Sequence, residues 1–452
     1  METTDPPAAV LCREVRGRGG RVHRVGESDT GLPGHGRIRV AVLPWPGVAG
    51  IGCAVFACVA TRDGPRTARL GGVPGLFWTA DLWVPAQAAV VLSAGRLRAS
   101  GRLSARAATT GGAAGTLPGC LALAPAPGTA AASVLFGVVA GGGAGLVHGT
   151  CPTPPGRWYP ERRGAAAACT ASGPARGAVP LLLGAGRAGQ RSLLAVTGAA
   201  VRAARTAAGR FFRDPPRNRW PAHAGPLTVP AGRAARRRHG KNPPAPRRTG
   251  PARAVRTPAL WLMALCLLGT AGVTVLDVLL VPSRGRAPGL GPAAMGRAAV
   301  AGGAGAAAVG AVSDLVERRS ALAVALPAPA AAQPGVPAAR AAGSAPLLLG
   351  RVAAAALAGG AVLPLVVASA ADHFGEHHGP STCALLAGAW LPPVLAGTGT
   401  TAAAARPARG AFAPAGCTAL ACAAAALFLE SPGLPTVRRI VPDPHPLGEE
   451  MA

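Results

Sequence analysis

The sequence is poor in charged residues, and poorest in acidic ones. Only 14% of its 452 residues are Asp, Glu, Lys or Arg, whereas average globular chains carry about 25%. A water-soluble protein of this length needs a charged surface, so the shortage argues against a soluble globular fold. Because disordered chains combine low hydrophobicity with high charge density, it also argues against disorder of the whole chain. Half of the residues are hydrophobic (50%), and the mean hydropathy is +0.33.

Aromatic residues are also scarce, at 4%, and a single Tyr is present. The 46 basic and 18 acidic residues give a net charge of +28, which in a soluble protein would suggest a nucleic-acid partner. Here the arginines lie between apolar stretches, where such residues orient membrane spans and meet anionic lipid headgroups. Few aromatic rings are available for base stacking. We therefore expect a lipid bilayer as the partner and no nucleic acid.

The ten cysteines contain no Cys-x-x-Cys pair, so neither a zinc site nor a disulfide framework is indicated. Most of them lie in apolar stretches and are expected to behave as small buried hydrophobes. The acidic and histidine residues of 372–378 are an alternative metal cluster, although adjacent loop histidines are more often solvated. No Ser/His/Asp or Cys/His arrangement has a supporting motif. We expect no catalytic residue, no metal and no cofactor.

Long apolar stretches recur along the chain, and about twelve approach the roughly 20 residues that a membrane-spanning helix needs. The stretch 192–212 is the weakest, because it contains Arg202, Arg205 and Arg210. The stretch 107–156 is long enough for two spans, with a turn near 125–129. The others are 40–61, 71–95, 165–186, 257–276, 298–312, 320–339, 352–371, 379–405 and 410–429.

The order of these stretches predicts an all-α membrane protein of two six-helix lobes. The lobes would be 40–212 and 257–429, joined by the basic cytoplasmic linker 213–256, with cytoplasmic tails at 1–39 and 430–452. The first 36 or so residues are polar and lack the apolar core of a secretory signal. Basic residues are commoner in the segments assigned to the inside, as the positive-inside rule requires. We expect a multi-pass, monomeric plasma-membrane protein.

Three glycines, Gly137, Gly141 and Gly145, lie four residues apart within one uncharged stretch. Residues at this spacing share one face of a helix, and small residues there allow helices to approach closely in lipid. Chance is the alternative, because the chain contains 64 glycines. We interpret the three as a helix-packing face.

The segment 310–319 reads GAVSDLVERR between two predicted spans. It resembles, in register, the loop signature G-x-x-S/A-D-x-x-G-R-R of the major facilitator superfamily, which is built from two six-span halves. An acid at a helix end and basic residues across a tight turn can clamp neighbouring helices in one conformational state. Glu317 stands where the family has its second glycine. The matching residues are Gly310, Ser313, Asp314, Arg318 and Arg319.

The corresponding loop of the first half, 95–102, is a looser match. It contains Gly95, Gly101 and Arg102, but it is one residue short and lacks the acid. For both loops the alternative interpretation is an ordinary basic loop on the inner side of the membrane.

A second loop narrows the resemblance. Segment 157–164 reads RWYPERRG and is similar to the W-F/Y-P-E/D-R-R-G loop of the oxalate/formate antiporter family, in its actinobacterial form. The segments 212–221, 256–263 and 371–376 resemble other stretches of that family, in its order and spacing. The motif residues are Trp158, Tyr159, Pro160, Glu161, Arg162, Arg163 and Gly164.

The resemblance implies a major facilitator fold, alternating access and a small carboxylate substrate. Oxalate-type members have basic residues inside spans eight and eleven, and the offsets place Ala306 and Trp390 there. Neither side chain can pair with a carboxylate, and an unpaired dianion at the bilayer midplane would be very costly. A monocarboxylate or a neutral solute is therefore more compatible than oxalate.

Ionisable residues inside predicted spans are functional candidates by default. Asp81, His148, Arg176 and Asp277 are of this kind. An aspartate could carry a proton and Arg176 could meet an anion; alternatively, each lies near a span end and reaches the interface. With Trp390 they form the candidate substrate or proton site.

We therefore expect a secondary transporter of a small solute, most simply a small organic anion, and no enzyme. One alternative is a degenerate membrane protein of the same fold that no longer transports. The other is a soluble, basic binding protein.

Overall fold

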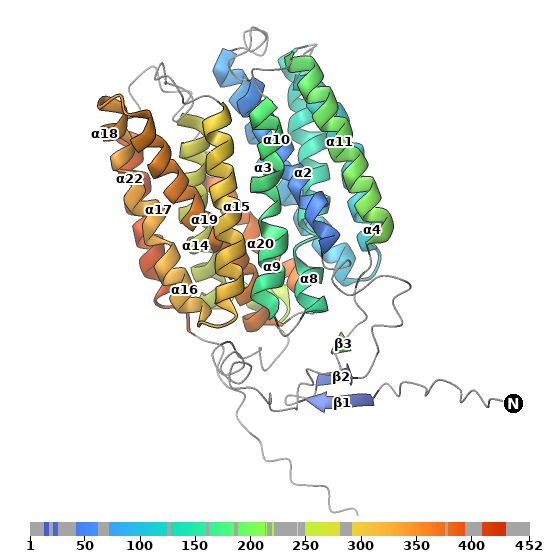
Figure 1. Ribbon diagram of the computed structural model, residues 1–452. Helices are drawn as coiled ribbons and strands as arrows, with labels where there is room; N and C mark the ends of the chain where they lie inside the picture. The colour runs from blue at the N-terminus through green and yellow to red at the C-terminus, as the bar shows by residue number, and fades with distance from the viewer. Residues whose placement is uncertain are drawn as a thin grey trace, which may run out of the picture.

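The chain folds into a bundle of helices that run mostly parallel to one axis (Figure 1). The computed structural model describes residues 13–17, 21–25, 42–61, 72–123, 128–159, 162–184, 189–212, 214, 219–220, 242, 249–280, 292–375, 378–393 and 409–430.

Helices of the first half coincide with the apolar stretches predicted there. Breaks at Gly115 and Ser172 divide two of the stretches into consecutive shorter helices. The helices are α2 (Pro44–Thr61), α3 (Gly72–Ala99), α4 (Ala105–Ala114), α5 (Thr116–Leu123), α6 (Thr129–Ala132), the π-helix η3 (Ser133–Ala140), α7 (Gly141–His148), α8 (Thr153–Trp158), α9 (Arg163–Ala171), α10 (Gly173–Gly184) and α11 (Gln190–Phe211).

The second half repeats this pattern after the short helix α13 (Pro251–Ala254). The apolar stretch 320–339 forms three consecutive helices, because prolines and glycines interrupt it. The helices are α14 (Pro258–Leu280), α15 (Pro292–Ser313), α16 (Arg318–Ala325), α17 (Pro327–Ala332), α18 (Gly335–Ala341), α19 (Ala345–Phe374), α20 (Gly379–Ala387), the 3₁₀ turn η7 (Gly388–Trp390) and α22 (Arg409–Ala426).

Three continuous helices among the described residues are long and apolar enough to cross a membrane: Thr129–Trp158, Met295–Ser313 and Ala345–Phe374. Pro258–Thr274 and Phe412–Ala426 are apolar but shorter. In α11 arginines lower the hydropathy, and a break at Ser172 divides the stretch 165–184 into two shorter helices. The all-α prediction nevertheless holds for the bundle.

Each half has its own apolar core. Val48, Trp83 and Phe136 belong to the first-half core, and Met263, Leu322 and Leu365 to that of the second. A third cluster joins the halves, because Leu182 of α10 packs with Met295 of α15 and Phe412 of α22. Helix α9 also packs on α15 and α19, and α3 packs on α20.

The glycine face predicted on the fourth span packs closely against α3. A Cβ atom added to Gly137, Gly141 or Gly145 would lie 2.6–2.9 Å from the carbonyl oxygens of Thr79, Trp83 and Gln87, respectively. These carbonyls are also four residues apart, so each glycine meets one turn of the neighbouring helix. The prediction of a helix-packing face is confirmed.

The three arginines of α11 lie in different environments. Arg202 and Arg210 are exposed, whereas Arg205 is fully buried. The Arg205 guanidinium donates hydrogen bonds to the carbonyl oxygens of Gly47 (3.1 Å) and Gly112 (3.4 Å) and to the Thr116 hydroxyl (2.5 Å). The helix therefore accommodates a charge in the bundle by placing it against helices α2, α4 and α5.

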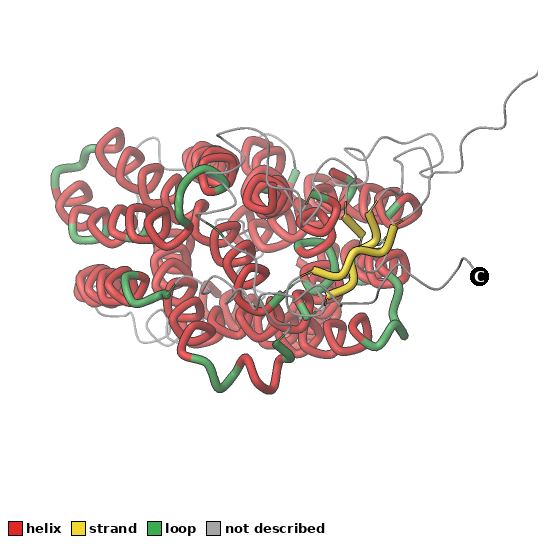
Figure 2. The backbone as a smooth tube through the Cα atoms, turned by 90° about the horizontal axis from the view of Figure 1, so that it is seen from below, coloured by secondary structure: helices red, strands yellow, loops and turns green. Residues whose placement is uncertain are grey.

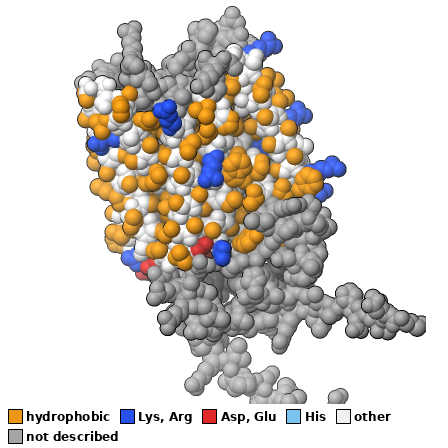
Figure 3. All heavy atoms as spheres, in the orientation of Figure 1, with side chains coloured by type: hydrophobic (Ala, Val, Ile, Leu, Met, Phe, Trp, Pro, Cys, Tyr) orange, Lys and Arg blue, Asp and Glu red, His pale blue; other side chains and the backbone are white. Residues whose placement is uncertain are grey.

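The outer face of the bundle in Figure 3 is largely hydrophobic. Large apolar side chains are exposed on the bundle, among them Val134 (54%), Val324 (79%) and Phe428 (72%). Monomeric soluble proteins rarely expose large contiguous apolar areas, which mark membrane or protein contacts. This surface disfavours the soluble binding protein.

Three short strands lie across one end of the bundle (Figure 2). Strand β1 (Arg13–Gly17) pairs with β2 (Arg21–Val25) in antiparallel orientation, and β2 pairs in parallel with β3 (Arg219–Trp220). The predicted N-terminal tail thus contacts the predicted linker, an association that no apolar pattern indicated.

Candidate functional site: a buried charge cluster between the halves

Two arginines and two aspartates meet at the end of the bundle that carries α8 and the start of α16, which is the lower end in Figure 1. Arg163 is the first residue of α9 and belongs to the first half. Asp314 follows α15, Arg318 begins α16, and Asp372 lies in the last turn of α19. We call these four residues the charge cluster.

Asp372 is the residue that joins the two halves. Its Oδ1 accepts a hydrogen bond from Arg163 Nη1 at 3.0 Å, and its Oδ2 accepts one from Arg318 Nη1. Arg318 Nη2 also reaches Asp314 Oδ1 at 3.3 Å. One carboxylate is therefore shared by a guanidinium from each half.

Asp314 makes a second connection by capping a helix of the other half. Its Oδ1 accepts from the Gly164 backbone N–H at 2.8 Å, and its Oδ2 accepts from that of Ala165 at 3.0 Å. The first N–H groups of a helix have no partner within the helix, and a negative charge there interacts favourably with the helix dipole. The acid of the GAVSD segment thus stabilises the start of α9.

Two glycines allow this close approach. A Cβ atom on Gly164 would lie 2.7 Å from the Gly310 carbonyl oxygen and 2.8 Å from Asp314 Oδ1. A Cβ atom on Gly310 would lie 2.8 Å from the Gly164 carbonyl oxygen and would also overlap Ala168. The glycine of each loop motif is therefore required by the other motif, across the interface between the halves.

Asn242, from the segment predicted as the linker, holds the turn between α15 and α16. Its amide donates to the carbonyl oxygens of Ser313 and Val316, both at 3.0 Å, and its Oδ1 accepts from the Arg318 N–H at 3.1 Å. The Ser313 hydroxyl donates to the Gly310 carbonyl oxygen at 2.9 Å. Sequence reasoning missed Asn242, because a single asparagine in a basic, proline-rich segment gives no signal.

The charge cluster is shielded from water. Its four side chains are only 5–9% exposed. Burial lowers the pKa of Arg318 to about 10, while Asp314 raises it and Arg163 lowers it. The guanidinium is therefore charged at neutral pH, and two cations face two anions in a setting of low dielectric constant.

The other residues of the two loop motifs lie around the charge cluster. Arg162 and Arg319 are exposed, while Trp158 is buried and Tyr159 is half-buried. Pro160 and Glu161 lie outside the described residues. The two Arg-Arg pairs differ in which arginine is buried. It is the second one, Arg163, in the loop of the first half and the first one, Arg318, in the loop of the second half.

The loop of the first half contains an ion pair that the sequence analysis did not predict. Arg98 Nη2 meets Asp214 Oδ1 at 2.6 Å, and Asp214 Oδ2 accepts from the Ala105 N–H at 3.3 Å. Gly101 has a positive φ of 77° and turns the chain before the exposed Arg102. The Gly95 carbonyl oxygen accepts from the hydroxyl of Ser381 on α20, at 3.4 Å.

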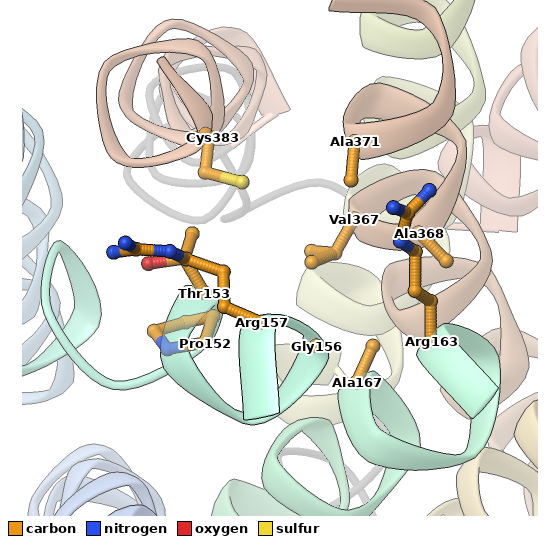
Figure 4. Close-up of a pocket in the computed structure, with 11 residues that line it drawn as sticks. Pro152, Thr153, Gly156, Arg157, Arg163, Ala167, Val367, Ala368, Ala371 and Cys383 are labelled. Atoms are coloured by element: carbon orange, nitrogen blue, oxygen red, sulfur yellow. The ribbon is translucent and has the colours of Figure 1, made fainter. Parts of the chain in front are cut away.

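A small cavity of about 30 Å³ lies beside the charge cluster (Figure 4). It is bounded by α8 and α9 from the first half and by α19 and α20 from the second. Arg157 and Arg163 contribute to a lining that is otherwise mostly apolar, with Thr153, Val367, Ala371 and Cys383. Such a volume holds a water molecule or two.

The candidate residues within the spans do not converge on one point. Asp81 is buried on α3, and Arg176 is exposed at the α10–α15 contact, where its Nη2 lies 3.4 Å from the Gly303 carbonyl oxygen. Trp390 is half-buried in η7. The remaining two candidates, His148 and Asp277, form separate hydrogen-bonded groups.

His148 ends a chain of three side chains. Trp83 Nε1 donates to Gln87 Oε1 at 2.8 Å, and Gln87 Nε2 lies 2.8 Å from His148 Nδ1. Because the indole N–H can only donate, the Gln87 amide must donate to His148. The imidazole Nδ1 is therefore the acceptor, and its proton lies on Nε2.

The metal alternative finds no support in the described part of the chain, which has no group of three or more His, Cys, Asp or Glu placed to hold an ion. Glu376 and His377 lie outside that part. The two nitrogens of His373 lie 2.8 Å from the carbonyl oxygens of Ser369 and Glu430.

No family model matches the sequence, and no curated protein matches it either. Among solved structures, this structure resembles that of the MFS (major facilitator superfamily) proton:xylose symporter XylE bound to 6-bromo-6-deoxy-D-glucose. The TM-score is 0.64 over 88% of this chain and 95% of that one, with 11% sequence identity. At this identity the likeness concerns the fold alone. The two helical halves and the charge cluster between them therefore belong to a chain with the major facilitator fold.

Proposed function

We propose that this protein is a secondary transporter of a small solute that works by alternating access. In the major facilitator fold, two six-helix lobes rock about a site between them. The charge cluster is the observation that carries the proposal. It joins the lobes at one end of the bundle through ion pairs, which can be broken and remade.

In this proposal the charge cluster is a lock that holds one end closed. Asp372 pairs with an arginine of each half, and Asp314 caps α9 of the opposite half. Opening this end would separate Arg163 from Asp372 and the α9 amides from Asp314, while water solvates the released charges. The lock therefore favours the closed state without making it permanent.

For the substrate we propose a small organic anion with a single carboxylate. The support is the loop resemblance, together with the absence of basic residues at 306 and 390, which disfavours a dianion. We further propose that the protein is a monomer that crosses the plasma membrane many times, with both termini and the 213–256 linker in the cytoplasm. The lobes would then be 40–212 and 257–429, and the charge cluster would lie at the cytoplasmic end.

Reconstitution into proteoliposomes tests this proposal. Purified protein is loaded with one unlabelled carboxylate at high concentration, and counterflow of the labelled form is measured across a panel of mono- and dicarboxylates and neutral sugars. We expect saturable counterflow of at least one monocarboxylate and none of oxalate. Flux of a sugar alone would support transport but overturn the anion.

The Asp372→Asn variant is the matched test of the lock. It should alter flux of the transported solute. The control variant is Asp214→Asn, because the Arg98–Asp214 ion pair lies within the first half and does not join the lobes. If correctly folded wild-type protein gives no flux above empty liposomes for any member of the panel, a non-transporting membrane protein becomes the better description.

A further inference from the structure

A buried carboxylate in the second half is bound by an amide instead of a cation. Asp277 lies on α14, and Gln333 lies between α17 and α18. Asp277 is 6% exposed and Gln333 is fully buried. The two other buried aspartates of this half differ from Asp277, because Asp314 and Asp372 both pair with Arg318.

The amide of Gln333 faces both oxygens of the carboxyl group. Gln333 Nε2 lies 3.2 Å from Asp277 Oδ1 and 3.3 Å from Oδ2. The Oε1 atom of the same amide is buried and has no hydrogen-bond partner. Within the part of the chain that the structure describes, Asp277 has no ion pair.

The surroundings of the pair are apolar. Helix α14 packs against α17, α19, α20, η7 and α22. Val273, Ala330 and Ala355 belong to the cluster that surrounds this level of the helices. The titratable or charged side chains described on those neighbouring elements are Arg351, Asp372 and His373 on α19, Cys383 on α20, and Cys417 and Cys422 on α22.

None of these groups neutralises Asp277. The Arg351 guanidinium lies against Gly335, two residues after Gln333, but among the described residues it makes no ion pair with Asp277. Asp372 and His373 lie at the far end of α19, at the charge cluster. Cys417 is exposed, and the Cys422 region contacts Cys266, three helical turns below Asp277. An ionised Asp277 would therefore be a buried anion held by a single amide group.

Ionisation leaves this pair badly matched. A carboxylate can only accept hydrogen bonds, so it uses the N–H₂ group and leaves Oε1 without a donor. A buried polar atom without a partner is costly, and an unpaired buried charge is more so. With Asp277 ionised, Gln333 Oε1 is an acceptor without a donor, and one added proton on the carboxyl group would supply that donor.

We propose that Asp277 and Gln333 form a proton-binding site within the second lobe. A proton from water binds one carboxyl oxygen. A rotation of the amide about the Gln333 Cγ–Cδ bond then lets that O–H donate to Oε1 while Nε2 donates to the other oxygen. Two reciprocal hydrogen bonds join a neutral acid to a neutral amide, and no other bond changes. The ligand is a proton, and the inference holds whether or not the protein transports a carboxylate.

Infrared spectroscopy of the purified full-length protein in lipid nanodiscs tests the site without a substrate. The C=O stretch of a protonated carboxylic acid is distinct from the bands of a carboxylate. Spectra are taken from about pH 5 to about pH 9, which spans the range above the ordinary aspartate pKa. Asp277→Asn is compared with wild type and with Asp214→Asn, which removes a carboxylate that is ion-paired to Arg98 and 37% exposed.

We expect the wild-type acid band at neutral pH to lose intensity in Asp277→Asn and to be unchanged in Asp214→Asn. Gln333→Leu keeps the acid but removes its partner, so its band should move to higher frequency. Circular dichroism and gel filtration confirm that each variant is folded. An acid band that is unchanged in folded Asp277→Asn overturns the proposal. Should that variant not fold, a band unmoved by Gln333→Leu overturns it instead.

Discussion

Replacing Asp372 by Asn would break the charge cluster at its shared residue. The change keeps the side-chain volume but removes the negative charge that faces Arg163 and Arg318. Both guanidinium groups are less than a tenth exposed, so each becomes a buried cation with less compensation. Removing one partner of a buried ion pair typically costs about 3–5 kcal/mol. We therefore expect the contact between the halves to be weakened by this order of magnitude.

The effect can be read at the backbone amides of Gly164 and Ala165. They donate to Asp314 across the interface, so their hydrogens exchange with solvent only when the halves separate at this end. A loss of about 3–5 kcal/mol corresponds to roughly 100- to 5,000-fold faster exchange, at 1.4 kcal/mol for each factor of ten. Hydrogen–deuterium exchange followed by mass spectrometry, on protein in nanodiscs, measures this for the peptide that covers the start of α9.

Asp214→Asn is the matched control. It removes a carboxylate that is also ion-paired to an arginine, but the contacts of Asp214, to Arg98 of α3 and to Ala105 of α4, lie within the first half. Because these contacts do not cross the interface between the halves, the effect of the variant on the α9 peptide should be less than about fivefold, or about 1 kcal/mol. Equal exchange rates at the start of α9 in the two variants would refute the assignment of the charge cluster as a lock between the halves.

Three other substitutions test the packing and polar contacts. Gly141→Ala should lower the thermal unfolding midpoint in detergent by an amount equivalent to about 1–3 kcal/mol, because its Cβ would lie 2.9 Å from the Trp83 carbonyl oxygen. The control Gly142→Ala should have little effect, because its Cβ would lie 3.4 Å from a Val90 methyl group. Equal losses of stability in the two variants would contradict the packing face. Arg205→Met should leave stability nearly unchanged, since replacing a buried charge by an apolar side chain of similar length is often neutral or stabilising. Arg205→Ala should instead cost about 2–5 kcal/mol of stability through the cavity it leaves. A large loss of stability in Arg205→Met would show that the hydrogen bonds of Arg205 to α2, α4 and α5 are essential. Asn242→Ala removes three hydrogen bonds from the α15–α16 turn and should speed amide exchange at Arg318 by more than tenfold, at about 1 kcal/mol per bond, while protection within α15 stays the same.

The positions of the helices were readable from local patterns. An uncharged apolar stretch of about 20 residues can satisfy its backbone in lipid only as a helix, so helices lie in the predicted stretches wherever the structure describes them. The glycines at 137, 141 and 145 were readable for the same reason: a spacing of four places small residues on one helix face whatever the partner helix is. The segment 310–319 was recognisable because its residues resemble, in register, the loop signature of the major facilitator superfamily.

The partners of these residues were decided only by the tertiary structure. Nothing in the sequence indicates that Asp372 lies between Arg163, 209 positions away, and Arg318, 54 positions away, or that Asn242 closes the turn beside them. The sequence showed Arg205 as a defect in a span and Asp277 as a charge near a span end. The burial of Arg205 and Asp277 changed the interpretation of both residues, because in a medium of low dielectric constant the energy of a polar group depends on which neighbours it can reach. The sequence by itself determined the helices, their order and their close-packing faces, whereas the folded bundle decided which charges are paired, which are shielded and which remain able to bind a proton.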